Sequence, residues 1–370
     1  MLYTLAHRGV AAVLVEADSD LAYSASGTNS GVLHTGFDST PGELETDLIL
    51  RAAPLRARVL RALDVPVIAS GAELRPRKDE DHETIRSLAA GARANGVETH
   101  VRESDGALLV PGESVTDPVA FTLAMARAAV AAGAQVLLDA KVTGIDQGQE
   151  CLDVRLADGR QVHADVVINC AGLYADEVAR LVGDDSFEIY PRKGEFFVFE
   201  LPDGQRLEQI LLPVPTKRTK GVLVFPTIDG KVIAGPTAHD DEDKTDWTVR
   251  PEARDEVLPK AVEQFPALAG LEPVASYAGL RPAGRGTNYV IGPSAACDRL
   301  INVAAIRSTG LTASLGIASH VAALLPERGV AVADELALPT PPDAATPYER
   351  GPWWQRTARR RALAPETAER

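Results

Sequence analysis

The chain has 370 residues, 45% of them apolar and 24% charged, so it is long enough to bury a large core and has the composition of a globular protein. Its formal net charge of −14 argues against nucleic acid or an anionic membrane as the main partner, since both attract clustered Lys and Arg. Cys151, Cys170 and Cys297 lie far apart, which excludes a disulfide framework and a cysteine-based metal site. Without a membrane-spanning apolar run or a signal-peptide pattern, we expect a cytoplasmic protein with no integral membrane segment, peripheral attachment to a membrane being left open.

The first eighteen residues, MLYTLAHRGVAAVLVEAD, are typical of the second half of a dinucleotide-binding βαβ unit. Residues 1–8 resemble the end of a helix, Gly9 its stop, and residues 10–16 a buried strand that closes on an acid. The first half of such a unit is a strand and a glycine-rich turn, which this sequence does not contain. The stretch is therefore either half of a nucleotide site or a helix–strand pair that only looks like one.

Helices and strands alternate along the next part of the chain. Apolar spacing predicts a helix over residues 42–63, a strand pair over 67–76 that turns at Gly71, and an amphipathic helix over 79–97 that ends at Gly96. Another helix follows over residues 117–134, with Asp117 as its cap and Pro118 at its first position.

The second half of the chain is richer in short strands. Strands are expected over residues 135–147 and 151–162, the latter with an Asp-Gly turn at 158–159. Residues 164–182 are predicted to form an apolar strand, a run of small residues and a helix, whereas 186–285 are typical of an antiparallel sheet with a turn at 228–230. A strand over 299–306 and a helix over 310–325 come next. From about Arg328 the periodicity is lost, and we expect an irregular tail that is mobile or contacts a partner.

Three separate segments, residues 10–17, 166–172 and 300–310, each run from a buried strand through small residues to a helix. In open α/β sheets, ligands bind at the carboxyl ends of strands, where helix N-termini present free N–H groups to anions. Each segment alone would be explained by a tight strand–helix connection. Together they favour a shared ligand.

Five segments of the sequence resemble those of a known protein family: SGTNSGVLHTGFD, VVINCAGLYAD, GVLVFPTIDGKVIAGPT, GLRPA and IRSTGLTASLGIASHVA. From residue 1 to about 330, the chain resembles FAD-dependent oxidoreductases of the D-amino-acid-oxidase type, most of all the branch with L-2-hydroxyglutarate and glycerol-3-phosphate dehydrogenases. The resemblance implies an α/β fold in which a glutathione-reductase-type, Rossmann-like FAD-binding domain, incomplete at its N-terminus, is interleaved with an α+β substrate domain on an antiparallel sheet. The FAD-binding domain would take residues 1–65, 117–185 and 286–328, the substrate domain 66–116 and 186–285, and the tail 329–370.

Family members begin with a strand and a G-x-G-x-x-G turn that contacts the FAD pyrophosphate. The sequence allows a degenerate non-catalytic homologue, a subunit completed by another polypeptide, or a start assigned too late. We expect the last of these, because the downstream blocks are intact, and we expect the chain as written to bind FAD poorly.

The resemblance also implies the cofactor-binding residues, which are Glu16, Thr28, Asn29, Ser30, Gly31, Val142, Ala171, Gly172, Gly310, Leu311 and Thr312. Glu16 would accept a hydrogen bond from the adenosine ribose, or else be a solvated acid at a strand end. The residues at 28–31 would contact the flavin, or else cap a turn. The helix that begins at Gly310 would direct its positive N-terminus at the flavin.

For the substrate, the candidates are His34, Arg281, Arg307 and Lys193. His34 suits the base that removes a hydroxyl proton, or else it only bonds its own loop. Arg281 suits a carboxylate or phosphate, with a salt bridge as its alternative, and Arg307 either the substrate or FAD. The remaining histidines, including His163, show no cluster that suggests a metal.

These assignments predict hydride transfer to flavin N5 from a small anionic hydroxy compound, a 2-hydroxy acid such as L-2-hydroxyglutarate or glycerol 3-phosphate. An amino-acid or amine oxidase of the same fold is the alternative. The electron acceptor, whether oxygen, a quinone or a redox protein, is left open.

Overall fold

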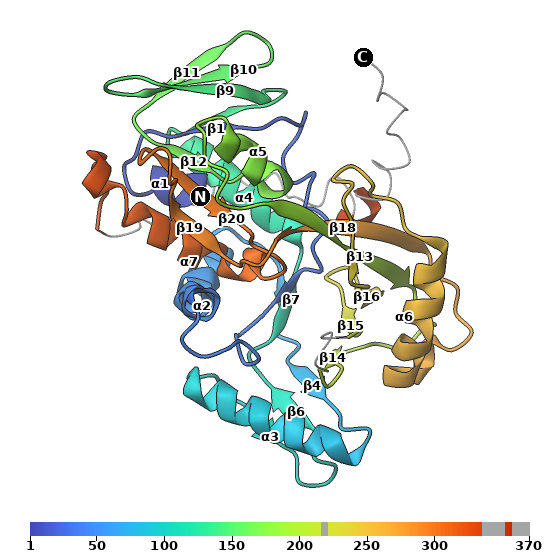
Figure 1. The fold of residues 1–370 in the computed structure, drawn as a ribbon. Helices are drawn as coiled ribbons and strands as arrows, with labels where there is room; N and C mark the ends of the chain where they lie inside the picture. The colour runs from blue at the N-terminus through green and yellow to red at the C-terminus, as the bar shows by residue number, and fades with distance from the viewer. Residues whose placement is uncertain (216–220, 335–351, 357–370) are drawn as a thin grey trace.

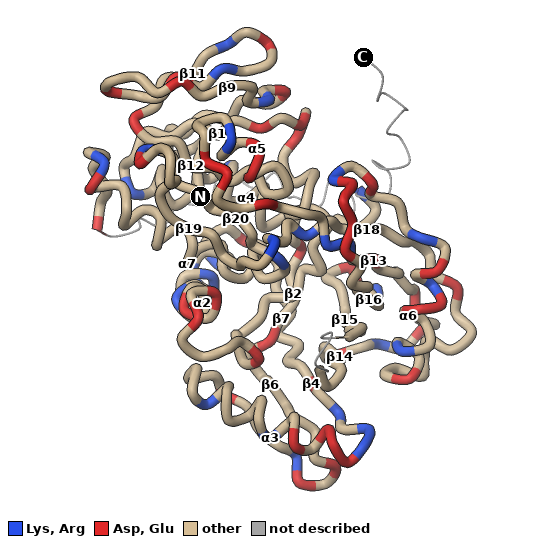
Figure 2. Tube along the Cα trace, viewed as in Figure 1, with Lys and Arg blue, Asp and Glu red and all other residues tan. Residues whose placement is uncertain are grey.

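The computed structural model describes residues 1–215, 221–334 and 352–356 of the chain. Within these ranges the fold is mixed α/β, with helices packed against five open sheets (Figure 1). Acidic and basic residues are interspersed over most elements (Figure 2), so the net charge does not come from one acidic block. None of the helices described is both long and apolar enough to cross a bilayer.

Parallel strand pairs form the centre of the α/β part. β1 (Val13–Val15) pairs with β8 (Gln135–Leu137), and β12 (Val167–Asn169) pairs with β20 (Leu300–Ala304). β19 (Val290–Pro293) adds an antiparallel strand to β20. Among the described residues no ladder joins the two pairs.

The β1 strand differs from its prediction in length and in burial. It covers three of the seven residues expected, and Val13, which was expected in the interior, is 42% exposed. The preceding helix is confirmed in a short form, as α1 (Leu2–Ala6), and Gly9 after it has a φ of +72°.

The longer helices of this part pack on the parallel strands and on one another. They are α2 (Leu44–Ala62), α4 (Pro118–Ala131), α5 (Ala175–Arg180), which continues the short 3-10 turn η1 (Gly172–Tyr174), and α7 (Gly310–Ala322), followed by η3 (Pro326–Arg328). The α2 and α7 helices cross closely because Gly316 lacks a side chain: a Cβ there would lie 2.1 Å from the carbonyl oxygen of Leu48. The predicted cap of α4 is confirmed, since Asp117 accepts hydrogen bonds from the Val119 and Ala120 amides, each at 2.8 Å.

A nine-stranded sheet forms the other part of the molecule. Its strands, in spatial order, are β17 (His239–Asp240), β13 (Ile189–Phe199), β16 (Val232–Gly235), β15 (Leu223–Pro226), β14 (Ile210–Leu212), β4 (Ala72–Leu74), β6 (Leu108–Val110) and β5 (His100–Val101), with β18 (Ala275–Gly284) also paired to β13. Helix α6 (Pro251–Gln264), with the 3-10 turn η2 (Pro266–Leu268) after it, packs on the side of Phe197 and Phe199, and α3 (Asp79–Ala94) packs on β4 and β6. The antiparallel sheet predicted for residues 186–285 is confirmed. The sheet also unites strands from 72–110 with strands from 189–284, which supports the two-domain division that we keep as a proposal.

A small sheet connects the two parts. It is formed by β2 (Val32–Leu33), β7 (Ser114–Thr116) and β3 (Val67–Ile68). The predicted strand pair around Gly71 is wrong, because β3 joins this sheet whereas β4 pairs with β6 and β14 of the large one.

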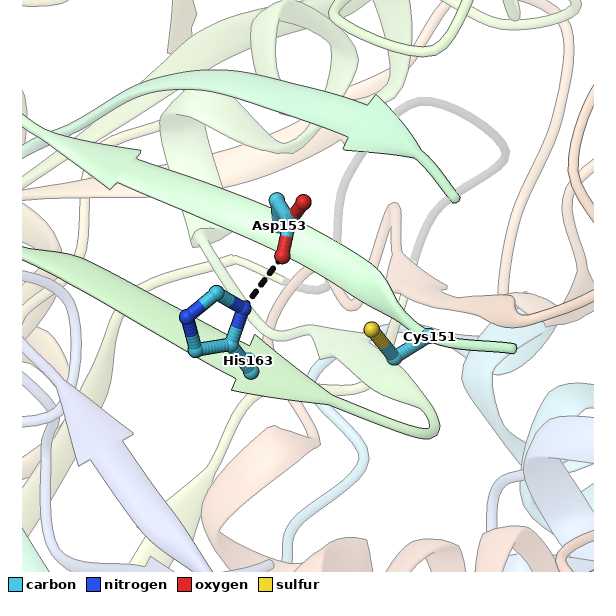
Figure 3. A group of neighbouring side chains, drawn as sticks. All are labelled: Cys151, Asp153 and His163. Carbon is cyan, nitrogen blue, oxygen red and sulfur yellow. Dashed lines mark hydrogen bonds and ion pairs between the residues drawn. The ribbon is translucent and has the colours of Figure 1, made fainter. Parts of the chain in front are cut away.

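A meander of β9 (Val142–Gln147), β10 (Leu152–Leu156) and β11 (Gln161–Ala164) lies at the end of the molecule away from α3 (Figure 1). Its register sets Asp153 opposite His163, and Cys151 lies beside them (Figure 3). Two predictions are therefore wrong, namely that the cysteine spacing excludes a cysteine-based metal site and that His163 belongs to no cluster of metal-type ligands. Only the pairing of β10 with β11 brings these residues together.

Part of the predicted irregular tail is packed into the core. Trp353 and Trp354 are 3% and 4% exposed, and the Trp353 ring meets the Tyr277 ring edge-on at 5.3 Å. Arg356 donates to Asp20 Oδ2 at 2.6 Å. For residues 352–356, the expectation of a mobile tail is wrong; the rest of residues 335–370 lies outside the described part.

Candidate active site

A cavity of about 910 Å³ lies between the large sheet and the N-terminus of α7. Its walls come from β13, β18, the end of β20, the start of α7 and the loop around residues 25–46. This volume lies within the range of small-molecule and cofactor sites, about 300–1,000 Å³. The cavity is therefore the candidate site for substrate and cofactor.

Two of the three predicted strand-to-helix segments line this cavity. Cys170 and Gly172 follow β12, and residues 303–311 lead from β20 into α7. Residues 10–17 do not line it.

Only some of the predicted cofactor-binding residues line the cavity. Those that line the cavity are Thr28, Asn29, Ser30, Gly172, Gly310 and Leu311, and those that do not are Glu16, Gly31, Val142, Ala171 and Thr312. Gly31 is required by packing instead: its φ is +78°, and a Cβ would lie 2.2 Å from the Thr116 carbonyl oxygen. The Glu16 side chain accepts the Asp18 amide at 3.0 Å.

The residues at the start of α7 fit a flavin. The cap residue Thr309 makes no side-chain cap hydrogen bond, so the first amides of α7 keep the donors and partial positive charge that favour an anionic ring edge. After the neighbouring strand β12, a Cβ built on Gly172 would meet no atom within 4 Å, which leaves room for a flat ligand against the backbone. Ile306 and Leu311 add apolar walls. Thr309 instead donates to Glu45 Oε1 at 2.6 Å.

His34 lies on the cavity wall directly after β2, and it is paired with an acid that the sequence did not reveal. Its Nδ1 atom is 2.9 Å from Oε2 of Glu113, which is fully buried. The other oxygen of Glu113 accepts the Thr35 amide at 2.6 Å and the Thr35 hydroxyl at 2.8 Å. Since β2 and β7 pair Leu33 with Ser114, the same register continued by one residue places His34 opposite Glu113. An acid beside a short strand was the only sequence signal, and it is a weak one.

A second residue missed by the sequence interpretation is Arg56 on α2. Its guanidinium donates to the carbonyl oxygens of Thr312, at 2.7 Å, and His34, at 3.1 Å, and burial lowers the pKa of Arg56 to about 10. The Thr312 hydroxyl in turn accepts the His34 amide at 3.0 Å. Thr312, predicted to contact the cofactor, thus holds the backbone of His34.

Arg281, on β18, lines the cavity. It donates to the carbonyl oxygens of Arg192 and Lys193, both at 3.0 Å, and of Thr237 at 2.8 Å. Burial, with Arg192 nearby, lowers the pKa of Arg281 to about 10, so it stays protonated at neutral pH. In the described part of the chain no carboxylate forms an ion pair with it, and Nη1 keeps both of its donors.

Arg307 and Lys193 are committed to partners within the protein. Arg307 lines the cavity but is 47% exposed, donates to Asn288 Oδ1 at 3.0 Å and lies 3.7 Å from Glu45 Oε2. Lys193 is fully buried away from the cavity and donates to Asp246 at 2.5 Å. Arg281 is therefore the better placed of the predicted cations for an anionic substrate.

The chain is similar to known FAD-dependent oxidoreductases in sequence and in structure. The family model described as FAD dependent oxidoreductase matches residues 1–324. Glycerol 3-phosphate dehydrogenase of Caloramator mitchellensis is 28% identical over 328 residues, which cover 84% of this chain and 68% of that protein. L-2-hydroxyglutarate dehydrogenase of Escherichia coli K12 is 28% identical over 240 residues, 61% of this chain and 57% of that protein.

Among known structures, the FAD-bound, dithionite-reduced L-alpha-glycerophosphate oxidase of Mycoplasma pneumoniae superposes with a TM-score of 0.85. It is 24% identical and covers 93% of this chain and 95% of its own. Glycine oxidase of Bacillus cereus has a TM-score of 0.76 at 21% identity, covering 88% of this chain and 92% of its own.

Proposed function

The chain belongs to the family of FAD-dependent oxidoreductases, enzymes whose cofactor is FAD, and on this premise we propose that it oxidises a small anionic hydroxy compound. The proposed substrate is a 2-hydroxy acid such as L-2-hydroxyglutarate, or glycerol 3-phosphate. When bound, FAD supplies the acceptor for the hydride that leaves the carbinol carbon.

The observation that carries this proposal is the His34–Glu113 pair on the wall of the cavity that Arg281 also lines. Oxidation of an alcohol to a carbonyl requires a base for the hydroxyl proton. Because the Glu113 carboxylate accepts the proton on Nδ1, it favours the neutral tautomer in which Nε2 is the basic nitrogen. The hydroxyl proton would pass to Nε2, and the product would be the keto compound.

Arg281 is the proposed anchor for the anionic group of the substrate. Its guanidinium is held in place by three carbonyl oxygens, so the plane of its remaining donors is fixed before a ligand binds. Such a planar donor set matches carboxylate and phosphate oxygens. Arg192 also lines the cavity, but its charge is balanced by Asp240, 3.3 Å away.

Both candidate substrates carry the required anion, and the curated relatives act on one or the other by name. The test is anaerobic bleaching of the flavin in the holoenzyme, with L-2-hydroxyglutarate, glycerol 3-phosphate and a set of amino acids supplied separately. We expect bleaching by one of the two hydroxy compounds. Bleaching by amino acids alone would overturn the proposal in favour of an amine oxidase of the same fold.

A further inference from the structure

The meander of β9, β10 and β11 carries a cluster of three different ligand types outside the cavity. Asp153 on β10 is paired in register with His163 on β11, so both side chains lie on the same face of the sheet. Cys151 lies just before β10, two residues from Asp153, and its thiol is directed toward the pair, as Figure 3 shows. Leu152 and Val154 alternate with them and are buried on the opposite face.

The three side chains are already close enough to share an ion. Their ligand atoms all lie within 4.8 Å of one another, and His163 Nδ1 forms a hydrogen bond with Asp153. In tetrahedral zinc sites, bonds of about 2.0–2.3 Å hold the ligand atoms about 3.3–3.7 Å apart. Side-chain rotations of the three residues can close this difference, while the hydrogen-bonded ladder keeps the backbone of Asp153 and His163 fixed.

The ligand set selects the metal. One thiolate, one imidazole and one carboxylate are the ligands that zinc prefers, whereas calcium and magnesium bind oxygen atoms almost exclusively. The neighbouring charges do not oppose binding, because Asp146 on β9 and Arg155 on β10 form an ion pair with each other.

We propose that Cys151, Asp153 and His163 form a zinc site whose fourth position is held by water. On binding, the thiol of Cys151 releases its proton to solvent, and the neutral His163 ring carries its one proton on the nitrogen that does not bind the ion. The His163–Asp153 hydrogen bond gives way to a zinc–imidazole and a zinc–carboxylate bond. The thiolate and the carboxylate then balance the two charges of the ion. The metal would link β10 to β11 across their ladder, and this does not depend on the proposed oxidation reaction.

The test uses the full chain, stripped of metal with a chelator and titrated with Co²⁺, which reports a thiolate ligand through a charge-transfer band. We expect the band to saturate at one equivalent, Zn²⁺ to abolish it, and Zn²⁺ to slow alkylation of Cys151, measured by mass spectrometry. Cys151→Ser should remove the band. His163→Gln and Asp153→Asn should each weaken binding by at least about tenfold, the lower end of what changes around a metal cost.

His100→Gln is the matched control, because His100 is another exposed histidine, bonded to Glu98 at 2.9 Å, with no cysteine in its cluster. It should leave the titration unchanged. Zn²⁺ should also raise the Tm of the unaltered chain and not that of Cys151→Ser. Absence of the Co²⁺ band, or a band that His163→Gln and Asp153→Asn leave intact, overturns the proposal.

Discussion

The Nδ1 atom of His34 lies 2.9 Å from Oε2 of Glu113, a residue 79 positions further along the chain. The pair stands at the end of the β2–β7 ladder, where the two strands leave the small central sheet. Both oxygens of Glu113 are occupied, one by the histidine and the other by Thr35, so the carboxylate cannot rotate without losing a bond. The imidazole is thereby held in one orientation at the cavity wall.

Glu113→Gln is expected to slow flavin reduction while leaving substrate binding almost unchanged. An amide in this position must place its NH₂ group either against the two donors of Thr35 or against His34 Nδ1, which moves the ring proton to Nε2. Because a positioned base contributes roughly 10²- to 10⁴-fold, we expect kcat to fall by about 10²-fold. Stopped-flow measurement of anaerobic flavin reduction gives the rate. Thr35→Val, which removes one bond to Glu113 but keeps the His34 pair, should have a much smaller effect, and equal effects would contradict the assigned role.

Arg281→Lys is expected to raise KM for the anionic substrate. Lysine keeps the charge but loses the planar donors, and a charge-assisted hydrogen bond contributes about 1.5–3 kcal/mol, which corresponds to a rise of about 10- to 100-fold. Arg285→Lys is the matched control: Arg285 follows β18 and is paired with Glu242 and Glu188 outside the cavity. Steady-state kinetics with both variants decide the matter, and similar KM values in the two would remove Arg281 from the anion site.

Trp353→Ala is expected to destabilise the protein, although Trp353 lies in the C-terminal segment that the sequence predicts to be irregular. Trp353 is 3% exposed and packs on Tyr277, which stacks on Phe196 of the cavity wall at 4.9 Å. Loss of a buried tryptophan typically lowers the free energy of unfolding by about 3–5 kcal/mol. Urea unfolding measures it, with the half-exposed Val274→Ala as control, expected within about 0.5 kcal/mol of the unaltered chain. A change of that small size in Trp353→Ala would show that residues 352–356 are not held in the core.

The helices were predictable because their signals are local. The α2, α3 and α4 helices follow from apolar periodicity within a single window of sequence, and Asp117 caps α4 as expected. The pairing of the strands on either side of Gly71 was not predictable, because each strand joins a sheet through partners that are distant in sequence. The strand before Gly71 pairs with β7, and the strand after it pairs with β6 and β14.

The candidate site shows the same division. His34 and Arg281 could be proposed from their residue types and small neighbours, and the structure brings both to one cavity. Glu113 and Arg56 could not, because their roles come from contacts across the fold: Arg56 reaches Thr312, which is 256 positions away. The contact between Thr312 and His34 was equally hidden, because the place of Thr312 at a helix start does not reveal that its hydroxyl accepts the His34 amide.

Asp117 is expected to make stability depend on pH between about 4 and 6. Burial raises the pKa of Asp117 from 3.8 to about 6, against the two amides that it caps and in the presence of Asp229 and Arg356. In this window the folded state holds a proton that the unfolded state has released, so the free energy of unfolding falls as pH rises towards 6 and is constant above it. A shift of about two pKa units corresponds to about 2–3 kcal/mol.

Asp117→Asn keeps a capping oxygen but does not titrate, so its stability relative to the unaltered chain should improve by about 2 kcal/mol between pH 4.5 and pH 7. Urea unfolding of both proteins across this range measures the difference, and a difference that does not change with pH would show that Asp117 titrates normally.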